Sequence, residues 1–489
     1  MNPLTLIDGY KYSHGAQYPH GTTRVYSNWT PRESRVPGVS DVVFFGLQYF
    51  LQRYLGEEYG SFFAQPVEQA CAEYERRHIG YLGPNNIGSD HVRALHELGH
   101  VPLEFKALPE GTLTPLRVPM FTIENTHDEF AWLTNYVETI LSNLLWLPCT
   151  SATTAHHMRE MLDAAALATG SPLDFVPWQG HDFSFRGMPG PEAAALSGMG
   201  HLLSFTGTDT VPAFDLIERY YGPVAPDYLM GGSVPATEHS VMCAGGELSE
   251  RETFDRILDI YPTGIVSVVS DTWNLWRVLT EILPSLKERI MARAGKLVIR
   301  PDSGDPADIV CGDPEATPGS PEYKGVIELL WEVFGGATTT TGHTVLDPHI
   351  GCIYGDGITY DRAKEITDRL AAKGFASANM VFGIGSWTYQ GVTRDTYGFA
   401  MKATWCKVNG EGRDLYKRPV TGNGMKNSAK GRLAVHRSEH GRLYLVNLAT
   451  PEEEAHSLLE PVWRDGRFVR RQTFDDVRQV LRSQRRAQG

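Results

Sequence analysis

The middle of the chain, from about residue 150 to residue 390, alternates short β-rich runs with helical stretches. The runs combine β-branched and aromatic residues with terminal glycines or aspartates, as strands do, and they cover residues 264–271, 296–304, 351–357 and 379–386. The segments between them carry apolar residues at three- and four-residue spacing, which predicts helices. Alternating strands and helices predict a parallel sheet or a βα barrel.

Each of the four runs ends in polar or glycine residues. These are Asp271, then Arg300 and Asp302, then Gly355 and Asp356, then Gly383 and Gly385. In a parallel βα barrel the carboxyl ends of all strands open onto one face, and that face holds the active site. Asp and Gly also favour ordinary turns, so a single such end carries little weight. Four in succession, with an arginine among them, favour a site.

A chain of 489 residues is too long for one ordinary core. The alternating pattern predicts a catalytic βα-barrel domain over residues 151–390. The segments on either side of this domain have a different pattern. Aromatic-rich strands are predicted before it, and strands, Gly-rich turns and a final amphipathic helix (474–486) after it. We therefore expect an α/β protein with an irregular βα barrel and an α+β accessory domain built from both chain ends, 1–150 and 391–489.

Composition and charge argue against several classes of protein. A net charge of −13 is a poor match for sequence-independent nucleic-acid binding. The six scattered cysteines form no CxxC pair and no zinc-type spacing, which predicts free thiols in a reducing cytosol. The first residues lack a basic and an apolar region, so no secretory signal is predicted. The apolar segment 131–147 carries Glu138 on a polar face and predicts a core or interface helix, not a membrane span. We expect a cytoplasmic protein with no membrane or nucleic-acid partner.

The expected face combines carboxylates with cations. Asp302 and Asp356 suit ribose hydroxyls, or Mg²⁺ on a pyrophosphate. Gly385 and Ser386, just after a strand, suit backbone N–H contacts to a phosphate. Basic residues unusual for an acidic chain follow: Arg394, Lys402, Lys417 and Lys426. Any one of these is better explained as surface charge, but the set suggests a phosphorylated sugar as substrate.

Two upstream segments add candidates. Residues 181–187, HDFSFRG, place Phe183 and Arg186 at a predicted strand end. The phenyl ring suits stacking on a flat ring and the arginine suits a nearby charge, although a phenylalanine in such a place is more often a core residue. Residues 202–210 end an apolar run in Asp209, a carboxylate at the same rim.

Stretches spread over nearly the whole chain are similar to one family. They include 8–19, 25–33, 42–51, 124–141, 181–187, 205–211, 233–240, 266–274, 299–306, 354–358, 382–386 and 430–437. Through them the chain resembles the nicotinamide phosphoribosyltransferases, type II enzymes related to the nicotinate and quinolinate phosphoribosyltransferases. The type I signature, an apolar strand ending in two acidic residues before a Thr/Gly phosphate loop, is absent.

The resemblance implies transfer of phosphoribose from 5-phosphoribosyl pyrophosphate to nicotinamide, giving nicotinamide mononucleotide and pyrophosphate, with Mg²⁺ and ATP as cofactors. It implies that His239 is phosphorylated by ATP, with Glu238 beside it to orient the imidazole. From the residues alone, His239 is equally well a satisfied core histidine. The resemblance also implies a homodimer with shared active sites.

The resemblance further implies a role for each matching residue. Nicotinamide is held by Phe183, Asp209, Arg300 and, from the other subunit, Tyr10. Arg300, near the developing phosphoribosyl charge, and Asp302 are catalytic residues together with His239 and Glu238. Ribose and phosphate are held by Arg186, Asp302, Gly355, Asp356, Gly385, Ser386 and Arg394, with Arg32 and Lys402 from the other subunit. The pyrophosphate or ATP side is served by Lys417, Lys426 and Asp271, and Mg²⁺ near the pyrophosphate by Asp302, Asp356 and Asp271.

Three departures and three alternatives stand beside this interpretation. Ala400 replaces a small hydroxyl residue of the family, Ser386 replaces a glycine of the phosphate loop, and the loop from Lys417 to Lys426 is one residue longer.

The nearest alternative is nicotinate phosphoribosyltransferase, and Asp209 argues against it because a carboxylate repels a carboxylate ligand. The others are an inactive nucleotide-binding relative and an unrelated sugar-phosphate lyase. The lyase usually needs a Schiff-base lysine, which none of the four strand ends carries.

Overall fold

The computed structural model describes residues 2–222, 228–355, 357–416 and 429–486. The chain divides into two compact units. The first unit contains Met1–Thr153, Asp215–Pro223 and Val392–Gly489, and the second contains Thr154–Phe214 and Val224–Gly391. Among the described helices, none is both long enough and apolar enough to cross a membrane.

The second unit is built on a six-stranded sheet in which every pair of neighbours is parallel. Its spatial order is β7-β6-β13-β12-β9-β8. The strands are β6 (Gly180–Asp182), β7 (Gly207–Thr208), β8 (Thr263–Val269), β9 (Ala294–Arg300), β12 (Ile350–Tyr354) and β13 (Met380–Ile384). All four runs predicted from the sequence are neighbours here, so the predicted parallel sheet is confirmed.

The parallel sheet is curled into a half-barrel. Gly232 pairs with Gly207 of the edge strand β7, and Ala236 pairs with Ser267 of the opposite edge strand β8. Since residues 232–236 reach both edges of the sheet, the two edges must approach one another. The curl turns the carboxyl ends of the strands toward a common mouth.

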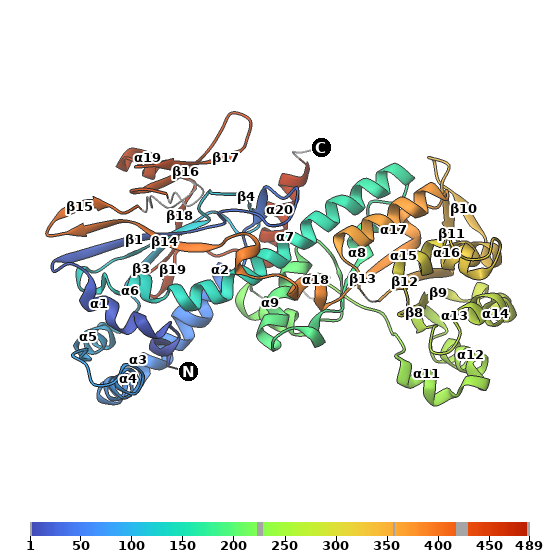
Figure 1. Cartoon of the computed structure of the whole chain (residues 1–489), viewed down its shortest axis with the longest axis horizontal. Helices are drawn as coiled ribbons and strands as arrows, with labels where there is room; N and C mark the ends of the chain where they lie inside the picture. Colours follow the sequence, from blue (N-terminus) through green and yellow to red (C-terminus); the bar gives the residue numbers. More distant parts are fainter. Residues whose placement is uncertain (1, 223–227, 356, 417–428, 487–489) are drawn as a thin grey trace. The chain divides into compact units, whose positions relative to one another are not determined.

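Helices follow the strands of the second unit. They include α9 (Pro191–Leu202), α11 (His239–Gly245), α12 (Glu250–Ile260), α13 (Leu275–Arg277), α14 (Leu283–Met291), α15 (Pro306–Cys311), α16 (Pro321–Phe334), α17 (Tyr360–Ala372) and α18 (Ser386–Gln390), while α8 (Val176–Gln179) comes directly before β6. In Figure 1, α15, α16 and α17 lie together, and α15 contacts both of the others. Asp305 starts α15, because its side chain accepts hydrogen bonds from the N–H groups of Ala307 and Asp308. The turn before it uses Gly304 at a φ of +91°.

The first unit is built on a seven-stranded sheet, with the order β15-β14-β1-β5-β3-β18-β19. The early part of the chain supplies β1 (Thr22–Thr30), β3 (Leu103–Ala107) and β5 (Phe121–Asn125). The late part supplies β14 (Ala400–Val408), β15 (Glu411–Asp414), β18 (Glu460–Arg464) and β19 (Arg467–Phe468). All its pairs are antiparallel, so this sheet joins the two ends of the chain. Its core includes Trp29, whose ring is stacked 5.4 Å from that of Phe399.

Smaller elements complete the first unit. Two small antiparallel sheets pair β2 (Asp41–Val43) with β4 (Leu113–Pro115), and β16 (Leu433–Arg437) with β17 (Leu443–Asn447). Its helices include α1 (His14–Gln17), α2 (Leu47–Phe50), α3 (Tyr59–Ala64), α4 (Val67–Leu82), α5 (Asp90–Leu98), α6 (Leu133–Tyr136), α19 (Pro451–Ala455) and α20 (Phe474–Arg486). The long helix α7 (Glu138–Thr169) begins in this unit and continues into the second, and together with α6 it contains the segment predicted to be a core or interface helix.

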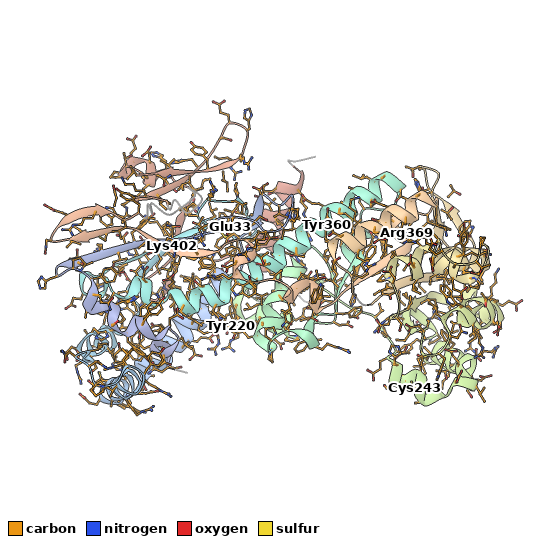
Figure 2. All side chains as sticks on the ribbon, viewed as in Figure 1. Glu33, Tyr220, Cys243, Tyr360, Arg369 and Lys402 are labelled. Carbon is orange, nitrogen blue, oxygen red and sulfur yellow. The ribbon has the colours of Figure 1, made fainter. Side chains whose placement is uncertain are left out.

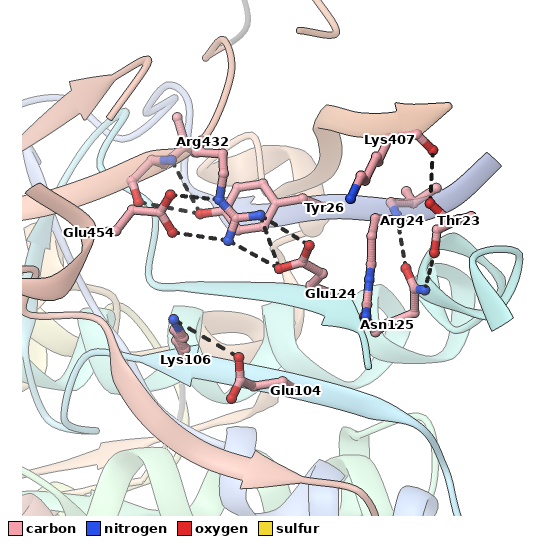
Figure 3. A network of polar contacts seen from close by, with 12 residues as sticks. Thr23, Arg24, Tyr26, Glu104, Lys106, Glu124, Asn125, Lys407, Arg432 and Glu454 are labelled. Atoms are coloured by element: carbon pink, nitrogen blue, oxygen red, sulfur yellow. Dashed lines mark hydrogen bonds and ion pairs between the residues drawn. The ribbon is translucent and has the colours of Figure 1, made fainter. Parts of the chain in front are cut away.

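Arg432 ties late segments of the first unit to its central strands (Figure 3). Its guanidinium pairs with Glu124 of β5 at 3.0 Å and with Glu454 of α19 at 2.6 Å. It also lies over the ring of Tyr26 on β1, 4.4 Å from the ring centre. The side chains of Arg432, Glu124 and Glu454 are only 24%, 20% and 16% exposed, so solvent screens these pairs poorly.

We predict that Arg432→Met lowers the melting temperature of the protein measurably. The change leaves two partly buried carboxylates without their cation, at a cost of about 2 kcal/mol. The matched control is Arg464→Met on β18, because the Arg464 side chain is 60% exposed and 3.6 Å from Glu104. Such an exposed pair contributes about 0–1 kcal/mol. Calorimetric scans of the three proteins test this, and equal shifts for the two variants would contradict it.

Candidate active site

The carboxyl ends of the parallel strands bring together several of the predicted residues. Phe183 follows β6, Arg300 ends β9 and Gly355 follows β12. Phe183 donates its backbone N–H to the carbonyl of Ile384, the last residue of β13, at 2.9 Å. The rim expected from the alternating sequence pattern is therefore present in the second unit.

An aromatic ring and an arginine form the centre of this rim. The guanidinium of Arg300 lies over the ring of Phe183, 5.3 Å from the ring centre. The imidazole of His181 lies against the same phenyl ring, with the ring centres 4.5 Å apart and the planes 39° apart. His181 and Phe183 are two residues apart, and this spacing puts side chains on the same face of an extended chain. Phe183 is half-buried, which leaves part of its ring open to a ligand.

Asp209 provides a carboxylate beside these rings. Its N–H donates to the carbonyl of Asp182 at 2.9 Å, which continues the pairing of β7 with β6. Its Oδ1 lies 3.1 Å from Nε2 of His181, and the side chain is 45% exposed. Burial acts to raise the pKa of Asp209, but hydrogen bonds from His181 and Ser233 and the charges of His181 and Arg300 outweigh it, so the pKa lies below its usual value. Asp209 is therefore ionised at neutral pH.

Two glycines make room for this arrangement. A Cβ on Gly355 would lie 2.8 Å from Oδ1 of Asp302 and 3.2 Å from Nε of Arg300. A Cβ on Gly383 would lie 2.8 Å from the ring of Phe183 and 2.7 Å from the Cα of Gly355. Both positions therefore require glycine because neighbouring groups fill the space. Asp356, the predicted partner of Gly355, lies outside the described residues.

A chain of polar contacts leads from the rim to the predicted phosphate-accepting histidine. The N–H of Asp302 donates to Oδ2 of Asp271 at 2.8 Å. The other oxygen of Asp271, Oδ1, lies 3.5 Å from Nε2 of His239, which begins α11 and is 45% exposed. The carboxylate next to the imidazole is thus Asp271, while Glu238 accepts a hydrogen bond from the hydroxyl of Ser240.

The predicted phosphate loop lies between β13 and α18. Gly385 has open space where a Cβ would point, and Ser386 is the first residue of α18. The hydroxyl of Ser386 lies 2.0 Å from where a Cβ of Gly187 would be. Gly187 therefore accommodates the extra side chain that distinguishes this loop from a glycine pair. Arg186, the residue before Gly187, is exposed.

The remaining predicted cations belong to the first unit. Arg32 donates from Nε to the carbonyl of Gly398 at 2.8 Å. Lys402 lies on β14 and is labelled in Figure 2. Burial lowers the pKa of Lys402, and the negative charge of Glu138 acts to raise it. The positive charges of Arg32, Arg394 and Lys11 lower the pKa further. These cations are thus close enough in one chain to interact.

Three residues of the predicted site remain to be placed. Tyr10, also in the first unit, is 56% exposed. The predicted Lys417 and Lys426 lie outside the described residues.

Three site residues were missed by reasoning from the sequence. His181 contacts both Phe183 and Asp209, and its two-residue spacing from Phe183 on a strand was a usable signal. Ser233 hydrogen-bonds Asp209 from the segment between the sheet edges, and Gly187 accommodates Ser386. No local pattern marks these two, because their partners are distant in sequence.

Solved structures with low sequence identity share this fold. A nicotinate-nucleotide pyrophosphorylase from Pyrococcus furiosus matches with a TM-score of 0.61 at 14% identity, covering 99% of this chain and 96% of that one. The human nicotinic acid phosphoribosyltransferase matches with a TM-score of 0.53 at 16% identity, covering 97% and 93%. At these identities the likeness shows the fold alone.

Sequence comparisons are more specific. The model of the nicotinate phosphoribosyltransferase family matches residues 178–474, and that of the nicotinamide phosphoribosyltransferase N-terminal domain matches residues 2–104. The nicotinamide phosphoribosyltransferase of Acinetobacter baylyi is 50% identical over 99% of this chain and 98% of its own. That of Xanthomonas campestris pv. campestris is 34% identical over 98% and 97%. The chain belongs to the nicotinate phosphoribosyltransferase family, in the branch of the nicotinamide phosphoribosyltransferases, and the resemblance inferred from the sequence is confirmed.

We predict that Gly355→Ala lowers kcat/KM by about 100-fold or more, because the methyl group displaces Asp302 and Arg300 by about 1 Å. The control is Gly80→Ala on α4, where a Cβ meets nothing within 4 Å. Steady-state kinetics and melting temperatures of both variants test this. A fully active Gly355→Ala variant would show that the crowding at the rim has no bearing on catalysis.

Proposed function

We propose that this chain transfers the 5-phosphoribosyl group of 5-phosphoribosyl pyrophosphate to nicotinamide, giving nicotinamide mononucleotide and pyrophosphate. The observation that carries the proposal is the ionised carboxylate of Asp209 at the edge of the Phe183 and Arg300 pair. A flat ring bearing an N–H donor fits this combination. Family membership, with 50% identity to a nicotinamide phosphoribosyltransferase, supports it.

The fold supports the same assignment. We assign the curled parallel sheet to the irregular βα barrel of type II phosphoribosyltransferases, covering residues 151–390. The antiparallel unit is then an accessory domain made by residues 1–150 and 391–489. The six free cysteines suit a reducing cytoplasm, where we place the reaction.

In the proposed reaction, the pyridine ring of nicotinamide stacks on Phe183 and its carboxamide N–H donates to Asp209. The ring nitrogen attacks C1′ of the ribose, and the bond from C1′ to the pyrophosphate oxygen breaks. Asp302 and Gly355 hold the ribose, so that C1′ is aligned with the nitrogen. Catalysis then depends mainly on alignment and on charge stabilisation of the leaving group.

The 5′-phosphate is bound by backbone N–H groups of Gly385 and Ser386, with Arg186 and Arg394 as cations. We propose that a second copy of the chain supplies Tyr10, Arg32 and Lys402, which completes each site in a homodimer. Tyr10 is exposed, as a residue that acts across an interface would be in a single chain. We also propose the roles predicted from the sequence for three further residues. The pyrophosphate or ATP side is served by Lys417 and Lys426, and the ribose and Mg²⁺ by Asp356.

ATP is proposed to transfer its γ-phosphoryl group to an imidazole nitrogen of His239, and ADP leaves. Since Asp271 lies 3.5 Å from Nε2, Asp271 is better placed than Glu238 to orient the imidazole. Mg²⁺ would fit here, because Oδ1 of Asp271 is a buried hard oxygen without a hydrogen-bond partner, while the backbone N–H of Asp302 donates to the other oxygen, Oδ2. When bound, Mg²⁺ neutralises charge on pyrophosphate. Through the contact of Asp271 with Asp302, the histidine is physically connected to the ribose side of the site.

The first test offers nicotinamide and nicotinate separately, with 5-phosphoribosyl pyrophosphate and Mg²⁺, to the protein and to its Asp209→Asn variant. We expect nicotinamide to be used and nicotinate refused, because an ionised Asp209 repels a carboxylate ligand. The variant should lose its preference for the amide by about 10-fold or more, since a neutral amide no longer repels nicotinate. Preference for nicotinate by the unaltered protein would refute this account of the base pocket.

A complementation experiment tests the shared site. Phe183→Ala and Tyr10→Ala should each be nearly inactive, because each removes one side of the proposed ring sandwich. Mixing the two variants at equal amounts under exchange conditions should restore about a quarter of the wild-type activity, since half of the dimers are mixed and each carries one intact site. Two Phe183 variants mixed together are the control. No recovery despite demonstrated subunit exchange would exclude a site shared in this way.

A further inference from the structure

We propose that His100, His127 and Asp465, all in the first unit, bind one divalent transition-metal ion of the Zn²⁺ class. One ligand atom from each residue lies within 4.8 Å of the corresponding atoms of the other two. Two imidazoles and one carboxylate are a donor set that favours Zn²⁺ and its neighbours over Mg²⁺, which prefers oxygen ligands. No part of the proposed transferase reaction uses these residues.

The orientation of His100 is the first argument. Its Nδ1 donates to the carbonyl of Leu98 at 3.1 Å, so in the neutral imidazole the lone pair is on Nε2. Nε2 is buried and has no hydrogen-bond partner. A histidine whose second nitrogen is fixed by a backbone carbonyl is the usual arrangement of a metal ligand in proteins.

The carboxylate opposite His100 is the second argument. Oδ1 of Asp465 lies 4.0 Å from Nε2 of His100, which is too long for a hydrogen bond. With Nε2 unprotonated, two lone-pair atoms face each other across this gap, and a cation between them removes the repulsion. Arg464 lies near the other oxygen, Oδ2, at 3.6 Å, so Oδ1 remains directed toward His100.

The backbone holds Asp465 in place. Asp465 is in the turn between β18 and β19 at a φ of +49°. Its N–H donates to the carbonyl of Leu103 at 3.1 Å, and its Oδ1 accepts a hydrogen bond from the hydroxyl of Thr126. A carboxylate oxygen has a second lone pair, so this bond leaves Oδ1 able to bind a metal. The preformed position lowers the entropic cost of binding.

His127 completes the set from a third segment. Its ring centre is 5.7 Å from that of His100, at 68° between planes, and the residue is exposed. Adjacent ligands of a tetrahedral Zn²⁺ are about 3.3 Å apart. Closing the site therefore takes a rotation of this exposed ring together with a narrowing of the 4.0 Å gap between His100 and Asp465. Three protein ligands leave a fourth position for water. The ion connects the end of α5, the segment before residue 128 and the β18–β19 turn.

The test measures Zn²⁺ bound to the full-length protein by equilibrium dialysis in excess Mg²⁺, with metal content read by atomic emission. We expect one more equivalent in the wild type than in His100→Gln, Asp465→Asn or His127→Gln, and affinity at least ~10-fold weaker in these variants. The control is His456→Gln, whose exposed ring hydrogen-bonds to the carbonyl of Glu452, within its own turn of chain. This control variant should bind as many equivalents of Zn²⁺ as the wild type.

Stability provides a second readout. Zn²⁺ should raise the melting temperature of the wild type and of His456→Gln, and leave that of the three variants unchanged, because only a ligand of the folded state stabilises it. His127→Gln changes an exposed side chain, so it remains informative if the other variants fail to fold. Equal Zn²⁺ content in the wild type and in His127→Gln would overturn the proposal, as would the absence of bound Zn²⁺ in the wild type.

Discussion

The parallel register of the six-stranded sheet determines where every chemical group of the second unit lies. Because β8, β9, β12 and β13 run in the same direction, their carboxyl ends meet, and Arg300 comes to lie over Phe183. The chain reverses after each strand within a few residues, so the polar groups stay at the rim while apolar residues such as Ile299 remain in the core. A slip of one residue in β9 would turn Arg300 into the core and Ile299 out of it.

The charged and polar side chains at this rim influence one another. Arg300 and His181 both lower the pKa of Asp209, and both contact the ring of Phe183. The groups that pack around the ring of Phe183 therefore also keep the carboxylate of Asp209 charged. That charge is the physical reason why the proposed base site is expected to distinguish an amide from a carboxylate. Asp271 extends the arrangement by contacting Asp302 on one side and His239 on the other.

Much of this was predictable from the sequence. The alternating pattern predicted the parallel strands, and the polar ends of those strands predicted Arg300 and Asp302 at one rim. Contacts that depend on residues distant in sequence were not predictable in the same way. The imidazole of His239 was paired with its neighbour Glu238 on proximity in sequence, whereas the structure brings Asp271 to it. Likewise, nothing in the sequence near residue 215 indicates that residues 215–223 join the first unit.

The sequence by itself determined the elements, the family and most of the groups that carry charge, because periodicity, turn chemistry and motifs are local properties of a chain. Tertiary structure alone decided which groups meet. The cysteines show no zinc-type spacing in the sequence, yet His100, His127 and Asp465 are brought together from three separate segments. Sheet pairing brings them together, since β18 pairs with β3 and so brings the turn at Asp465 beside the segment at His100. These residues are close to one another only in the folded chain.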